Sequence, residues 1–178
     1  MRKFTLSIVI LTLGVVVASA ASASAATSVT CQTSGSVKLS PGLSTKPQVQ
    51  NITIHGSLTS CEGEEASVTG GTYTAHLKTS EPVTCAALTS AGAPTTGTVV
   101  LKWSPHGQGN SQAAFGVPLT ETAAVAASGL VESGLFAESP ITGSLTQSYS
   151  GGPTCGVQNG KKKAKKVNEG TIAGTLTF

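Results

Sequence analysis

The chain has 178 residues and a net charge of +3 at pH 7, with 11% charged and 4% aromatic residues. It contains no aspartate, and Arg2 is its single arginine, which excludes a Ser-His-Asp triad, an aspartate dyad, an EF-hand loop and a guanidinium clamp for phosphate. Hydrophobic residues make up 39%, and this share with so little charge predicts a folded domain rather than a disordered chain.

The first 25 residues have the pattern of a secretory signal peptide. A short positive start, Met1–Lys3, precedes the uncharged apolar run Phe4–Val17, and a stretch of small residues then leads to Ala25 and Ala26. The apolar run is shorter than the roughly 20 residues that a membrane span requires. We therefore expect cleavage after Ala25 or Ala26, and a secreted mature chain without a membrane span.

Beyond this segment, apolar and polar residues alternate with a period of two, which predicts β-strands. Most connections are short, which favours antiparallel neighbours, and the glycine-containing stretch Pro105–Asn110 predicts a hairpin loop. In chain order, the expected strands are Val29–Thr33 with Val37–Leu39, Val49–Ser60, Ala66–Thr79, Val83–Leu88, Thr98–Ser104, Ser111–Leu119, Ala123–Glu132, Ile141–Tyr149 and Thr171–Phe178. We therefore predict a single antiparallel all-β domain over residues 26–178.

Three of the expected strands share the pattern I-x-G-[ST]-L-T, at Ile54–Thr59, Ile141–Thr146 and Ile172–Thr177. A glycine in the middle of a strand weakens the pairing unless the sheet bends there. The pattern therefore favours a barrel-like meander over a two-sheet, immunoglobulin-like β-sandwich. An alternative explanation of these glycines is that a ligand approaches the bare backbone.

The sandwich alternative depends on Cys85, Trp103 and Cys155, which follow one another in the order found in immunoglobulin domains. The match is incomplete, because Tyr149 stands six residues before Cys155 and not two. Trp103 ends an alternating apolar run and is predicted to anchor the core.

An even number of cysteines in an exported chain predicts two disulfides, and four cysteines allow three pairings. We favour Cys31–Cys61, because a hairpin around a turn at residues 40–47 places these two residues opposite each other at its open end. The pair Cys85–Cys155 then follows by elimination. No C-x-x-C spacing occurs and the histidines are scattered, so we expect no metal site.

Five lysines are clustered in a loop predicted at residues 156–168: Lys161, Lys162, Lys163, Lys165 and Lys166. Their combined charge would attract polyanions, and an anionic cell-envelope polymer is the partner that we expect. Specific nucleic-acid binding is not expected, because no arginine or stacking aromatic residue lies nearby. The alternative is a solvated loop whose charge keeps strand edges from pairing with other chains.

The sequence offers no catalytic residue and implies no cofactor. His55, His76 and His106 are scattered, and no G-x-S-x-G elbow is present. We therefore expect a non-enzymatic binding or envelope-associated protein. Two alternatives remain open, namely a carrier with an apolar ligand in a barrel cavity and a secreted hydrolase that uses paired glutamates.

Several segments are similar to those of small secreted proteins of unknown function from high-GC Gram-positive bacteria. They are Leu39–Leu43, Gly56–Cys61, Val100–Pro105, Ser133–Ala137 and Gly152–Val157 with the lysine run that follows. The resemblance covers nearly all of the mature chain and implies export and a compact β domain. It implies no activity or ligand, so no functional residue is transferred.

Overall fold

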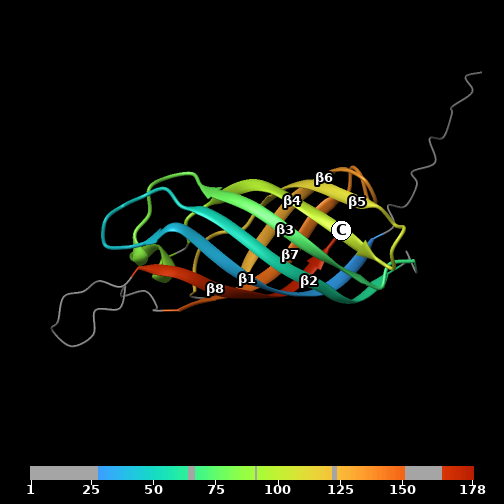
Figure 1. Cartoon of the computed structure of the whole chain (residues 1–178), viewed down its shortest axis with the longest axis horizontal. Coiled ribbons are helices and arrows are strands. Elements are labelled where there is room, and N and C mark those ends of the chain that lie inside the picture. The colour runs from blue at the N-terminus through green and yellow to red at the C-terminus, as the bar shows by residue number, and fades with distance from the viewer. Residues whose placement is uncertain (1–27, 64–66, 91, 122–123, 151–165) are drawn as a thin grey trace, which may run out of the picture.

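A computed structural model describes residues 28–63, 67–90, 92–121, 124–150 and 166–178. Within these ranges eight antiparallel strands form a closed barrel, in which each strand pairs with its neighbours in sequence and the last pairs with the first (Figure 1). The strands are β1 (Val29–Leu43), β2 (Asn51–Gly63), β3 (Gly70–Thr79), β4 (Thr95–Ser104), β5 (Asn110–Gly116), β6 (Val125–Ser133), β7 (Pro140–Tyr149) and β8 (Val167–Thr177). The prediction of an antiparallel all-β domain is confirmed, and so is the preference for a barrel over a sandwich. The predicted signal peptide lies outside the described residues.

One expected strand is wrong. Val83 forms only an isolated bridge with Gln48, and a short 3-10 helix, η1 (Cys85–Thr89), follows it. The side chain of Thr84 accepts a hydrogen bond from the Ala86 amide at the start of this turn. This single helical turn buries the side chains of both Cys85 and Leu88. Short apolar runs of this kind do not distinguish a strand from a helical turn by period alone.

Buried side chains line the interior of the barrel, since inward-facing residues alternate with outward-facing ones along its strands. Tyr73 pairs with Gly56 on the neighbouring strand, and a Cβ atom on Gly56 would lie 2.4 Å from the Tyr73 ring. Tyr149 and Gly170 repeat this arrangement between β7 and β8. The bare backbone at Gly56 therefore makes room for a tyrosine ring of the same chain, which explains this glycine without a ligand.

The η1 end of the barrel, where the odd-numbered strands end, is closed by connecting segments (Figure 1). Leu88 is fully buried there, and its carbonyl oxygen accepts hydrogen bonds from the Thr120 hydroxyl at 3.2 Å and the Glu121 amide at 2.9 Å. The buried Gln50 amide oxygen accepts from the Gly42 backbone N–H at 2.9 Å. The Leu88 bonds join the β3–β4 connection to the β5–β6 connection, and the Gln50 bond is made within the β1–β2 hairpin.

The Trp103 end, at the opposite opening, is closed by three aromatic rings. The ring of Trp103 packs edge-on against Phe136 and Phe178, with ring centroids 5.2 Å and 5.0 Å away. The Trp103 indole N–H donates to the Ser111 hydroxyl at 2.9 Å, and that hydroxyl donates to the Leu135 carbonyl at 2.6 Å. Trp103 is 3% exposed, so the prediction of a core anchor is confirmed.

A disulfide joins Cys31 and Cys61, as predicted from the hairpin that β1 and β2 form. The register of that hairpin shifts between Thr30 and Gln32, and Ser60 on the facing strand has a φ of 47°. No cysteine in the described part of the chain has a free thiol. The pair Cys85–Cys155 stays a prediction, because Cys155 lies outside the described residues.

Candidate functional site

The interior of the barrel carries a few polar side chains, and they hydrogen-bond to one another or to the backbone. The Thr33 hydroxyl donates to the Tyr73 hydroxyl at 3.0 Å. Tyr149 donates to the Gln147 side-chain oxygen at 2.5 Å, and the Gln147 amide donates to the Pro118 carbonyl at 2.6 Å. In the described residues no buried side-chain nitrogen or oxygen lacks a partner. The carrier alternative requires an enclosed apolar cavity, and it stays a prediction.

Burial raises the pKa of both tyrosine hydroxyls above the ordinary value, because the charged phenolate loses its hydration. The hydrogen bond from Thr33 offsets part of this effect at Tyr73. At Tyr149 the negative charge of the Glu121 carboxylate raises the pKa further. The same carboxylate accepts a hydrogen bond from the Tyr149 backbone N–H. Neither phenol is therefore suited to act as a base or nucleophile near neutral pH.

We expect this burial to make the fold sensitive to alkali. A group whose pKa is raised by folding stabilises the protein fully below its unfolded pKa, near 10 for tyrosine, and loses that contribution as the pH rises above it. The free energy of unfolding should fall above about pH 10, by up to about 1.4 kcal/mol per pH unit for each tyrosine. Urea denaturation at a series of alkaline pH values measures this slope.

The chain has two tyrosines, so its tyrosinate absorbance reports on these residues alone. We expect that absorbance to rise together with unfolding, measured by circular dichroism. The Tyr149→Phe variant should lose about half of the alkaline slope. A phenol that ionises near pH 10 in the still-folded protein would contradict the prediction.

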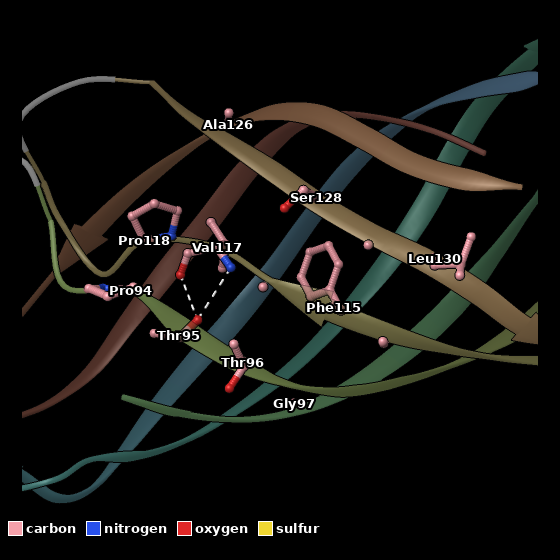
Figure 2. A pocket seen from close by; sticks show the side chains of 13 residues that line it. Pro94, Thr95, Thr96, Gly97, Phe115, Val117, Pro118, Ala126, Ser128 and Leu130 are labelled. Carbon is pink, nitrogen blue, oxygen red and sulfur yellow. Dashed lines mark hydrogen bonds between the residues drawn. The ribbon is translucent and has the colours of Figure 1, made fainter. Parts of the chain in front are cut away.

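The outer wall is hollowed where β4, β5 and β6 run side by side (Figure 2). We call this hollow the wall groove; it has a volume of about 480 Å³. The residues that line it include Pro94, Phe115, Val117, Pro118, Ala126 and Leu130. Gly97, Gly116 and Gly129 also line it. Every lining residue is uncharged, and Leu130 is 50% exposed.

The wall across β7, β8, β1 and β2 has a different character, which we call the hydroxyl face. Its outward residues are mostly serine and threonine. One cross-strand row runs through Ser148, Thr171, Ser36 and His55 and continues to Thr74 on β3. The His55 ring nitrogen Nδ1 lies 3.2 Å from the Thr74 hydroxyl. These side chains hydrogen-bond one another or face water, and they form no concentrated charge.

Charged residues divide between the two ends of the barrel. Those nearer the η1 end are Lys38, Lys46, Lys78, Lys166, Glu81, Glu121 and Glu169. Those nearer the Trp103 end are Lys102, Glu62, Glu132 and Glu138. In the described residues, lysines therefore outnumber glutamates at the η1 end, and glutamates outnumber lysines at the Trp103 end.

Of the predicted lysine cluster, only Lys166 falls within the described residues. It is exposed, and its ammonium group donates to the Pro41 carbonyl at 3.4 Å. Lys161, Lys162, Lys163 and Lys165 lie outside the described residues. In the sequence they stand between Ser150 and Lys166, which both belong to the η1 end.

The histidines and glutamates do not converge in the described structure. His55 and His76 are exposed on the middle of the barrel wall, His106 lies in the turn between β4 and β5, and the described glutamates are divided between the ends. Within the described ranges no cluster of histidine, cysteine or acidic residues could hold a metal ion. The described residues also contain no helix long and apolar enough to span a membrane.

No protein-family model, curated protein or solved structure matches this chain. The candidate sites are therefore judged on their geometry and charge. The wall groove was not predicted, although one signal for it is present in the sequence. Leu130 occupies the side of β6 on which Ala126, Ser128 and Glu132 face outward, so a large apolar residue stands where the alternation calls for a small or polar one.

Proposed function

We propose that the protein is an exported, non-enzymatic binding module whose η1 end contacts an anionic polymer of the cell envelope. The division of charge along the barrel carries this proposal. Lys46, Lys78 and Lys166 are exposed near the end at which β7 ends and β8 begins, and the lysine run stands between these two strands in the sequence. A polyanion would be attracted to this end and repelled from the glutamates at the other.

Export is supported by the pattern of residues 1–25 and is compatible with the Cys31–Cys61 disulfide, which persists in oxidising compartments. The candidate partner is a phosphate-rich chain such as teichoic acid. Ammonium groups contact phosphates as point charges and release counterions when they do so. Such binding requires neither a cleft nor aromatic platforms.

We expect the protein to bind immobilised poly(glycerol phosphate) with a strong dependence on salt. If the five lysines of the run and Lys46 and Lys78 each neutralise one phosphate of a flexible chain, affinity should fall by about 1,000-fold between about 50 mM and about 200 mM salt. A variant with Lys161, Lys162, Lys163, Lys165 and Lys166 replaced by glutamine should lose this binding. Equilibrium binding at several salt concentrations measures both effects.

Two further variants locate the contact. Replacing Lys46 and Lys78 with glutamine should weaken binding and lower the salt slope by about 1 to 2 units. Lys102→Gln at the Trp103 end removes the same kind of charge and should leave binding unchanged. Equal losses from both ends would show attraction by net charge alone, and retained binding by the five-lysine variant would reject the proposal.

A further inference from the structure

We propose that the wall groove binds an extended, uncharged peptide segment of a partner protein, which adds a short strand to an open edge of β6. This site is independent of the η1 end and of the lysine run. The argument begins with the hydrogen-bond ladder between β5 and β6, which covers only part of β6.

The ladder between β5 and β6 ends where Gly116 faces Ser128. On its other side β6 continues to pair with β7, with Val125 facing Leu145 and Ala126 facing Ser144. The first three residues of β6, 125–127, are therefore in the β7 ladder and outside the β5 ladder. Of these three residues Ala126 lines the groove, at the point where the β5 ladder has ended.

The edge is open because the chain after β5 turns toward the start of β4. Ala93 and Leu119 exchange two backbone hydrogen bonds of 3.2 Å and 2.8 Å. The Thr95 hydroxyl donates to the Val117 carbonyl at 2.7 Å (Figure 2). Residues 117–119 thus bond to residues 93–95, and among the described residues the β5–β6 ladder does not extend to residues 125–127.

Residues 117–119, on the other side of this gap, are poorly suited to pair with β6 themselves. Pro118 lines the groove and has no backbone N–H to offer to β6. Its carbonyl oxygen is already bonded to the Gln147 amide at 2.6 Å, and Gln147 lies on β7, beyond β6. This bond links Pro118, a lining residue of the groove, to β7.

The chemistry of the groove favours a peptide over other ligands. An open strand edge presents alternating N–H and C=O groups, and another extended backbone matches them. The uncharged lining would penalise a charged ligand side chain, whereas the exposed Leu130 offers an apolar contact at the far end. A volume of about 480 Å³ lies within the usual range for ligand sites, about 300–1,000 Å³.

The test uses a panel of capped pentapeptides built from uncharged residues, with alternating valine and threonine as the parent sequence. We expect saturable changes in the backbone amide NMR signals of residues 125–127 when a peptide is added. Amide hydrogen exchange should slow at the same residues, because the added strand protects them. A peptide with N-methyl groups on alternate residues keeps its side chains but loses backbone donors, and it should bind at least about tenfold more weakly.

Two matched protein variants complete the test. Ala126→Arg places a long charged side chain in the groove and should lower peptide affinity at least about tenfold. Ala173→Arg makes the same change at an exposed alanine of the hydroxyl face and should leave affinity unchanged. Circular dichroism shows whether both variants keep the fold.

Three outcomes would overturn the proposal. The first is the absence of saturable shifts at residues 125–127 with every peptide of the panel. The second is equal binding of the N-methylated peptide, which would show that the strand edge takes no part. The third is concentration-dependent self-association that Ala126→Arg abolishes, because this would assign the groove to a second copy of the chain.

Discussion

Replacing Trp103 with alanine is expected to lower the free energy of unfolding by about 3–5 kcal/mol. The indole ring fills the Trp103 end of the barrel and contacts both Phe136 and Phe178. Its removal leaves a cavity at a site where β4, β5 and the β6–β7 turn meet. Native domains are stable by only about 5–15 kcal/mol, so a large share of the stability should be lost.

The β6–β7 turn is expected to respond most strongly to this change. Phe136 has a φ of 63° and Glu138 a φ of 69°, conformations that cost a residue with a side chain about 1–3 kcal/mol. The packing of Phe136 on Trp103 and the bond from Ser111 to the Leu135 carbonyl offset that cost. Without the indole, limited proteolysis should cut near this turn faster than in the native protein.

Urea denaturation followed by far-UV circular dichroism measures the loss, since the chain has no other tryptophan to report by fluorescence. Trp103→Phe keeps an aromatic ring but removes the N–H bond to Ser111, so we expect a smaller loss. Val100→Ala on the same strand removes a side chain that is 38% exposed, and it should change stability by only about 0.5 kcal/mol. A Trp103→Ala loss as small as that of Val100→Ala would contradict the packing argument.

The strands could be predicted because each one has a solvent-exposed polar face and a buried apolar face. Tyr73, Ala75 and Leu77 alternate with polar residues along β3, and all three are buried in the barrel. The same logic located the β1–β2 hairpin and hence the Cys31–Cys61 bond. β1 is longer than predicted, because Gly35 continues the strand through a stretch with no apolar side chain, beside the Tyr73 hydroxyl.

Closure of the sheet depends on pairs that a single strand does not reveal. Tyr73 faces Gly56, Trp103 faces Gly71, and Phe115 stands between Gly97 and Gly129 on its two neighbouring strands. Each bulky ring thus lies next to a residue without a side chain, an arrangement known to stabilise glycines in sheets. The mid-strand glycines predicted curvature, but only the register shows which ring each glycine accompanies.

The wall groove could not be predicted for a related reason. It depends on where the β5–β6 ladder stops, and that is decided by tertiary bonds such as Thr95 to Val117. The lysine cluster, in contrast, was visible in the sequence as a charge pattern. The fold adds that Lys46 and Lys78 lie at the η1 end, where Lys166 also lies.

Removing the Cys31–Cys61 disulfide is expected to destabilise the protein by about 3–4 kcal/mol. The bond closes a loop with a sequence separation of 30, and the chain-entropy model gives this magnitude for a loop of that size. The double variant Cys31→Ala and Cys61→Ala isolates this bond, whereas a reductant would attack every disulfide. The cost arises mainly in the unfolded chain, so urea denaturation should show a lower midpoint and an equal or slightly larger denaturant slope.

A matched control lies on the same two strands. Ser34 and Ser57 face each other across β1 and β2 with their hydroxyls 3.4 Å apart on the exposed wall, and replacing both with alanine should change stability by only about 0.5 kcal/mol. If the cysteine variant lost no more than this serine control, the covalent link would add nothing to the hairpin. The ladder from Gln32–Thr59 to Ser40–Asn51 would then be sufficient to hold β1 and β2 together.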